Sequence, residues 1–182
     1  MGKKLLVILF TIYCLVGVLY LALPEFSFPK PPPDSLKSQE PADLESPLRQ
    51  GYFTNLSRAE VLVWYKNQFN HVEVFGYSLK LPTPLLNYPP EEAQTLIRDQ
   101  TSSTFLQEYV HPFRESIYIN GFEPKTANNE PAFLVEGKSY QQKIIVRLVP
   151  SNVFIREFLF VLSAFGIFIL YNAFKIVLKK ND

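Results

Sequence analysis

The chain has 182 residues, with 18 Lys or Arg against 17 Asp or Glu and a formal net charge of +1. This balance argues against a nucleic-acid-binding protein, which normally concentrates basic residues on one surface. The only cysteine, Cys14, excludes an internal disulfide and a cysteine-rich metal site.

An uncharged apolar run of 19 residues, Leu5–Leu23, lies close to the N-terminus. A helix of about 20 residues crosses the hydrocarbon core of a bilayer. A cleaved signal peptide is the alternative, but its apolar region spans only about 7 to 15 residues and ends at a small-x-small site. Because no such site precedes Pro24, we predict that residues 5–23 form a transmembrane helix and an uncleaved signal anchor, behind a cytoplasmic tail at residues 1–4.

Residues 24–47 differ sharply from the apolar run in composition. Seven of these 24 residues are proline, including the run Pro31-Pro32-Pro33, and acidic residues outnumber basic ones. Such a composition buries little apolar surface and favours an extended polyproline conformation. We therefore predict that residues 24–47 form a proline-rich stalk.

The middle of the chain, residues 48–151, has an ordinary size for one domain. Ser57 and Glu60 form a capping box at the start of a helix whose apolar face includes Val61, Tyr65 and Phe69. A second short helix is predicted from Pro90, because proline suits the first helical position and acidic residues follow it.

Strand-like runs make up the rest of this domain. His71–Leu81 alternates, and its change of phase at Phe75-Gly76 predicts a β-bulge. Gly137-Lys138 is expected to close a tight hairpin. We predict an extracytoplasmic α+β domain: a small antiparallel or mixed sheet with two short helices on one face, flanked by N- and C-terminal transmembrane helices. Three or four further strand-like runs are expected, among Thr104–Val110, Ser116–Phe122, Ala132–Glu136 and Tyr140–Val149.

A second uncharged run, Phe158–Phe174, predicts a transmembrane helix at residues 153–178, which Ser151 or Asn152 can cap. Basic flanks stay on the cytoplasmic side. Lysines precede the first run and follow the second. We therefore predict a protein of the cell membrane with both termini in the cytoplasm, including the tail at residues 179–182. The central domain is then extracytoplasmic. These flanking lysines are Lys3, Lys4, Lys175, Lys179 and Lys180.

Three groups of residues are candidates for function. The two histidines, His71 and His111, can form a metal or acid–base cluster if strands bring them to Glu73, Glu108 or Glu115; surface histidines at strand ends are the alternative. The second group lies in the proline-rich segment from Leu81 to Pro90. If its apolar side chains are exposed, they form a contact patch for a partner or a lipid surface; if they are buried, they cover the core of the domain. Small residues are the expected contacts between the two membrane helices. The patch contains Leu85, Leu86 and Tyr88, and the small residues are Gly17, Ser163, Ala164 and Gly166.

The sequence contains no recognised catalytic motif, phosphate-binding glycine loop or metal-ligand motif, so no catalytic residue and no cofactor are expected. We therefore expect a two-pass membrane protein that acts as a non-enzymatic interaction or assembly factor. Its partners are the lipid bilayer and a membrane or envelope protein, with no nucleic acid. Two alternatives remain: an accessory subunit of a transport or secretion complex, and an envelope hydrolase that uses one of the histidines.

Overall fold

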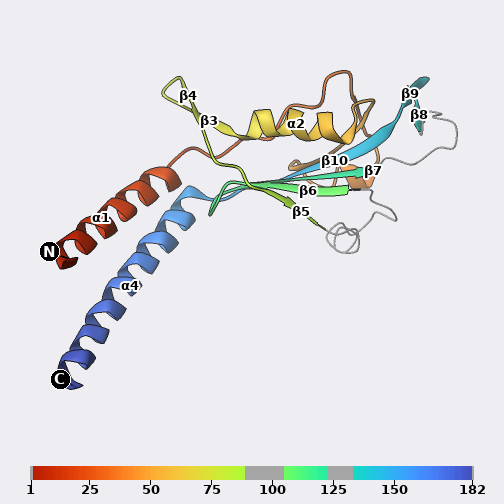
Figure 1. Cartoon of the computed structure of the whole chain (residues 1–182). Helices are drawn as coiled ribbons and strands as arrows, with labels where there is room; N and C mark the ends of the chain where they lie inside the picture. Colours follow the sequence, from red (N-terminus) through yellow and green to blue (C-terminus); the bar gives the residue numbers. More distant parts are fainter. Residues whose placement is uncertain (1, 89–104, 123–132, 182) are drawn as a thin grey trace. The chain divides into compact units, whose positions relative to one another are not determined.

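The computed structural model describes residues 2–88, 105–122 and 133–181, and the side chains of 4–88, 105–122 and 133–177. The chain forms two compact units. One consists of Met1–Glu25 and Ser151–Asp182, and the other of Phe26–Pro150. Figure 1 shows the helices of the first unit in red and blue, and the sheet of the second in green, cyan and orange.

The first unit consists of two long helices, α1 (Gly2–Leu21) and α4 (Val153–Asn181). Both are long and apolar enough to cross a membrane, and most of their described side chains are exposed. Of the two candidate caps of α4, Ser151 and Asn152, the structure uses Asn152. Its side-chain oxygen accepts hydrogen bonds from the backbone N–H groups of Phe154, at 2.9 Å, and Ile155, at 3.2 Å. These bonds satisfy donors that a helix start leaves without partners.

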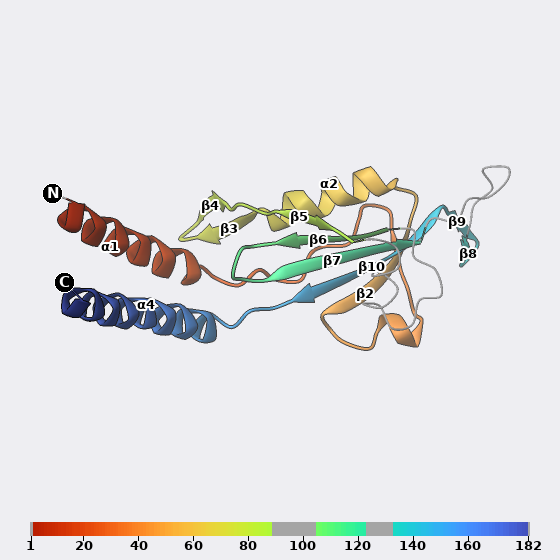
Figure 2. The same cartoon turned by 60° about the horizontal axis from the view of Figure 1, so that its bottom comes forward.

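The second unit is built on a six-stranded antiparallel sheet, so the predicted α+β class is confirmed. Its order is β1-β2-β10-β7-β6-β5, which places β10 in the interior between β2 and β7 (Figure 2). The strands are β1 (Leu36–Lys37), β2 (Arg49–Thr54), β5 (Leu85–Asn87), β6 (Phe105–Val110), β7 (Ser116–Phe122) and β10 (Gln142–Val149).

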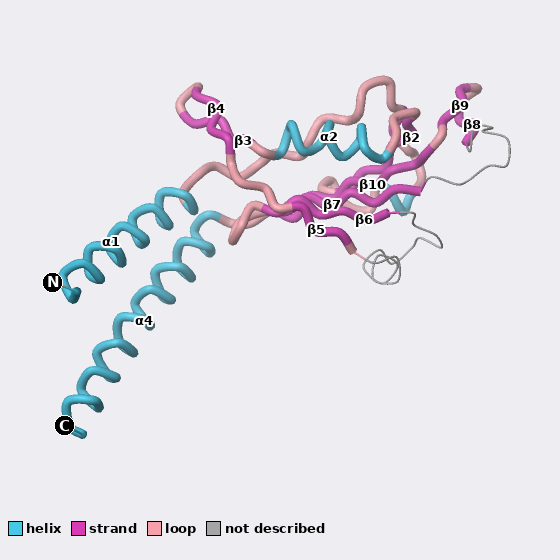
Figure 3. The backbone as a smooth tube through the Cα atoms, in the orientation of Figure 1, coloured by secondary structure: helices cyan, strands magenta, loops and turns pink. Residues whose placement is uncertain are grey.

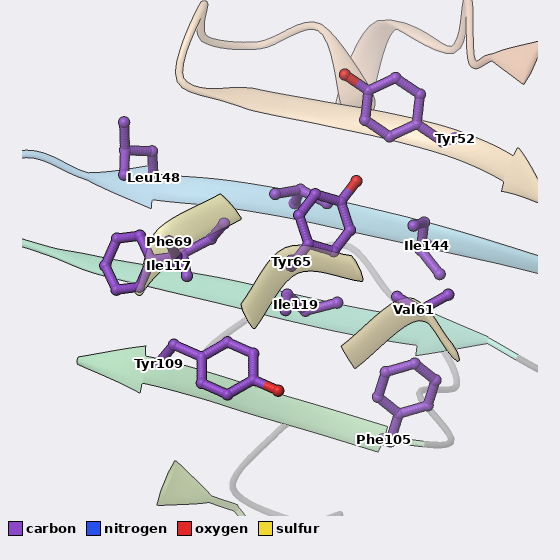
Figure 4. Packing of buried hydrophobic residues seen from close by; sticks show 11 residues of the cluster. Tyr52, Val61, Tyr65, Phe69, Phe105, Tyr109, Ile117, Ile119, Ile144 and Leu148 are labelled. Atoms are coloured by element: carbon purple, nitrogen blue, oxygen red, sulfur yellow. The ribbon is translucent and has the colours of Figure 1, made fainter. Parts of the chain in front are cut away.

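Helix α2 (Arg58–Phe69) covers one face of this sheet. The predicted capping box is confirmed, with bonds in both directions between Ser57 and Glu60. Val61, Tyr65 and Phe69 are fully buried and point onto the strands (Figure 4). On the sheet the same core contains Tyr52, Phe105, Tyr109, Ile117, Ile119, Ile144, Val146 and Leu148.

The domain has one described α-helix and the short 3₁₀ helix η1 (Pro41–Asp43), so the expectation of two short helices on one face does not match. The helix predicted from Pro90 lies outside the described residues.

Two separate hairpins extend from opposite ends of the sheet (Figure 3). One consists of β3 (His71–Val74) and β4 (Tyr77–Lys80), and the other of β8 (Phe133–Val135) and β9 (Lys138–Tyr140). The predicted bulge at Phe75-Gly76 is wrong, because these two residues turn the chain back on itself. The hairpin expected near Gly137 is present, with its turn one residue earlier.

The predicted stalk is also wrong, because residues from Phe26 onward pack along the domain. The Phe26 ring meets Phe69 edge-on, with centroids 4.8 Å apart, and the Lys30 N–H donates to Gln68 at 2.9 Å. Further on, β1 pairs with β2, and the buried Asp43 lies 2.8 Å from the Lys143 ammonium. Prolines in extended conformation are compatible with this packing, since the segment also supplies aromatic side chains to the core.

Candidate functional site

His111 lies at the end of β6 and is buried, with 1% of its surface exposed. Its Nε2 donates to the Phe69 carbonyl at 2.7 Å, and its Nδ1 lies 3.1 Å from a Glu115 carboxylate oxygen. The ring stacks on the Phe69 ring, with centroids 4.0 Å apart and an interplanar angle of 7°. The surface position considered for this histidine is therefore wrong, and both of its ring nitrogens already have protein partners.

Glu115 connects three parts of the domain. Burial would raise the pKa of its carboxyl, but the hydrogen bond with His111 and the charge of Arg114 lower that pKa to about 2. The same carboxylate accepts a bond of 3.3 Å from the N–H of Phe26. Glu115 therefore joins the β6–β7 turn to the end of α2, through His111, and to the segment that enters the domain.

His71 has a different environment. It is half-buried at the start of β3, and its Nδ1 lies 2.5 Å from the side-chain oxygen of Asn70. Of the three glutamates considered, Glu73 is exposed on β3 and Glu108 accepts a hydrogen bond from Tyr88. Within the described ranges no group of three His, Cys, Asp or Glu residues is placed to hold a metal ion.

Leu85 and Leu86 of the candidate contact patch lie on β5, which is an edge strand among the described residues, and Tyr88 follows this strand. Leu85 and Leu86 are 47% and 46% exposed. Tyr88 is half-buried, and its hydroxyl donates to Glu108. Burial, followed by this hydrogen bond, raises the pKa of Tyr88. The two leucines thus offer apolar surface beside a strand edge, whereas Tyr88 faces the domain.

Of the candidate small residues in the first unit, Gly17 lies directly against the other helix. A Cβ atom at Gly17 would lie 2.3 Å from Cζ of Phe160, and the Tyr13 and Phe160 rings lie 5.7 Å apart. Ser163 instead donates to the Leu159 carbonyl of its own helix, and Gly166 has open space around it. Ala164 is half-buried. The sequence analysis missed Phe160, which a search for small residues could not find.

Arg156 is a second residue that the sequence analysis missed as a contact. It lies in the first turn of α4 and is 6% exposed. Its guanidinium donates to the carbonyls of Leu21 at 2.7 Å, Leu23 at 2.5 Å and Ser151 at 3.3 Å. The last carbonyls of a helix lack intrahelical partners and carry partial negative charge. Arg156 therefore binds the C-terminal end of α1 to the N-terminal end of α4.

An open recess of about 480 Å³ lies where the β8–β9 hairpin meets the segment before β1. Asn55 lies in its wall, donating to the Ser139 carbonyl at 3.2 Å and accepting from the Gln141 N–H at 2.9 Å. Asn55 thus fixes the hairpin, and the recess combines only one acidic and one basic side chain, Asp34 and Lys138, with polar and apolar neighbours.

No family model, characterised protein or solved structure matches this chain. The assignment of a function therefore depends on the contacts described above. These contacts are of three separate kinds: Arg156 joins the helix ends of the first unit, and in the second unit β5 carries exposed leucines and His111 pairs with Glu115.

Proposed function

We propose that this chain is a two-pass membrane protein that holds its α+β domain close to one face of the bilayer, where the domain acts as a non-enzymatic interaction or assembly factor. Both termini lie in the cytoplasm and the domain lies outside it. The bilayer is one partner, and a membrane or envelope protein is the other.

The observation that carries this proposal is that the chain enters and leaves the domain at the same end of the sheet. Phe26 donates to Glu115, and Val149 pairs with Ser116, the next residue. Only four residues separate α1 from Phe26, and three separate Val149 from α4. Two spanning helices with such short connections would bring this end of the domain near the lipid surface.

The charges that flank the two helices support this orientation. Lysines flank the far ends of both helices, and basic flanks stay in the cytoplasm. Arg156, at the opposite end of α4, is engaged by three backbone carbonyls and so has its own structural role.

Cysteine labelling in intact cells tests the topology. In a Cys14→Ser background, Lys138→Cys places a thiol on the exposed β8–β9 hairpin, and Asp182→Cys places one at the C-terminus. We expect a membrane-impermeant maleimide to label position 138 only, and position 182 after the membrane is permeabilised. Labelling of both positions, or of 182 alone, in intact cells contradicts the proposal.

The β5 edge is the contact that we propose for the protein partner. Edge strands present unpaired backbone groups that accept an added strand, and two half-exposed leucines adjoin this edge. A photo-crosslinking residue at Leu86 should capture one partner of defined mass, whereas the same residue at Lys37 on β1 should not. Recovery of monomer alone from both positions contradicts an interaction role for this edge.

Replacing the two long helices distinguishes this proposal from the alternative, in which the chain is an accessory subunit that binds a complex through its helices. Replacement of α1 and α4 by unrelated apolar helices should preserve partner capture if the domain binds the partner. Loss of capture, with the topology retained, would favour binding through the helices themselves.

A further inference from the structure

Two turns of the domain hold phenylalanine where backbone geometry favours another residue. Phe75 (φ 51°) and Gly76 (φ 81°) are the central residues between Val74 and Tyr77, which form a strand pair. Positive φ at both central positions is the type I′ hairpin turn, which favours Asn-Gly. A bulky residue is rare with positive φ.

The turn between β6 and β7 repeats this pattern. The Arg114 N–H donates to the His111 carbonyl at 2.9 Å, which closes a four-residue turn around Pro112 and Phe113. Proline followed by a residue of positive φ is the type II pattern, and its second central position favours glycine. Phe113 occupies that position with φ 62°.

Neither phenylalanine packs into the domain. Phe75 is 98% exposed and Phe113 is 87% exposed, and Tyr77 beside the first turn is 80% exposed. Each phenylalanine therefore adopts an unfavourable backbone conformation and buries little surface in return. A local rule broken without a structural gain is typical of a functional position.

Both turns lie at the end of the sheet where the chain enters and leaves the domain (Figures 1 and 2). The β6–β7 turn contains Glu115, which binds Phe26, and it adjoins the Ser116–Val149 pair. The base of the β3–β4 hairpin is held nearby, because Asn70 accepts from Leu81 and the preceding carbonyl, that of Phe69, accepts from His111.

Neither turn exposes a charged side chain at its tip, that is, at Phe75-Gly76 or at Pro112-Phe113. The residues Val74–Tyr77 carry none, and the nearest charged side chain of β3 is Glu73. Beside Phe113, the side chains of Arg114 and Glu115 are 0% and 1% exposed and form an ion pair of 3.0 Å. An apolar surface of this kind enters a lipid interface without exposing a charge to it.

We propose that Phe75, Tyr77 and Phe113 insert into the boundary between headgroups and acyl chains of the same bilayer that α1 and α4 cross. Aromatic side chains concentrate at this depth of a membrane. The inserted rings would give the domain two further lipid contacts and so fix its orientation over the surface. This inference rests on the two-pass topology proposed above.

The β8–β9 hairpin supplies a matched control. Its turn has the same geometry, with Glu136 at φ 51° and Gly137 at φ 74°, but its exposed residue is charged. It also lies at the other end of the sheet, beside the start of β10 (Figure 3).

The test uses the full chain with its single tryptophan replaced, Trp64→Phe, and one new tryptophan at a time: Phe75→Trp, Phe113→Trp or Glu136→Trp. Each variant is reconstituted into phosphatidylcholine vesicles, with or without lipids brominated in the upper acyl chain. We expect brominated lipid to remove most of the emission at positions 75 and 113 and to leave the emission at 136 unchanged.

An equal fractional loss of emission in brominated lipid at all three positions would overturn the inference. A blue-shifted emission at 75 or 113 that bromine does not quench would also overturn it, because protein rather than lipid would then cover the ring. The cysteine labelling in intact cells described above is repeated on each tryptophan variant, with Cys14→Ser and either Lys138→Cys or Asp182→Cys added, so a failed topology is distinguished from a failed insertion. Should Trp64→Phe unfold the chain, spin labels at the same three positions in the Cys14→Ser chain report depth through their exposure to oxygen.

Discussion

The Phe160 ring of α4 lies against the backbone of Gly17 in α1, so that a side chain at position 17 would begin 2.3 Å from Cζ of that ring. We expect Gly17→Ile to weaken the association of the two helices by about 1 to 3 kcal/mol, because the ring must be displaced. Gly166→Ile is the control, since no heavy atom lies within 4 Å of a Cβ there. Unfolding in dodecyl sulfate titrations measures both. Equal losses, or an unchanged loss from Gly17→Ile in a Phe160→Ala background, would contradict the contact.

Replacement of Arg156 should separate the end of α1 from the start of α4. Arg156→Gln removes charged donors from three carbonyls, and we expect a loss of about 2 to 3 kcal/mol. Arg156→Lys should recover only part of this, since an ammonium does not reproduce the planar fork of a guanidinium. The same titrations apply, with exposed Arg147→Gln as the control. A control that loses as much as Arg156→Gln would show that loss of any arginine charge is sufficient.

Glu115 should make the stability of the domain depend on acid. Its pKa is about 2 in the folded chain, against 4.5 as the ordinary value. A lowered pKa means that the stabilisation is complete above about pH 4.5 and is lost as the pH falls from 4.5 towards 2, in total on the order of 3 kcal/mol. Chemical denaturation in detergent between pH 7 and pH 2.5 measures this slope. Glu115→Gln should be less stable at pH 7 and flatter below pH 4.5, whereas exposed Glu73→Gln should keep the slope of the parent chain.

The capping box of α2 should contribute to the stability of the α+β domain, independently of the two long helices. Ser57 accepts from the Glu60 N–H, and the Glu60 carboxylate accepts from the Ser57 N–H at 2.8 Å. These bonds lower the pKa of Glu60. We expect Ser57→Ala to reduce the free energy of unfolding by about 1 kcal/mol. Exposed Ser78→Ala on β4 should change it by less than about 0.5 kcal/mol. Thermal unfolding monitored by circular dichroism compares the two, and a smaller effect at Ser57 than at Ser78 would rule out a capping role.

The parts of the fold with local signals were predictable. The start of α2 follows from Ser57 and Glu60, and the run Ser116–Phe122 coincides with β7, because capping and alternation are encoded within a few residues. The turn at Phe75-Gly76 was predicted wrongly because its local signal is ambiguous. A change of phase fits a bulge or a turn, and phenylalanine is not the residue that identifies a type I′ turn.

Contacts between distant segments were not predictable. Composition described the segment after Pro24 as unable to fold, but Phe26 finds its partner on Phe69, 43 residues away in the sequence. The role of Arg156 was not predictable either, because its acceptors are backbone carbonyls, which no sequence pattern reveals. For the candidate site, the sequence offered Glu115 as one of three glutamates that His111 could meet, but it could not show which of them makes the contact or that Phe69 covers the histidine.

The interior position of β10 has a mechanical consequence. The strand pairs along its length with β2 on one side and β7 on the other, and it leads within three residues into α4. Antiparallel hydrogen bonds run perpendicular to the strands. A pull on α4 along the direction of β10 would therefore load both ladders in shear, so that their bonds resist together instead of opening one after another.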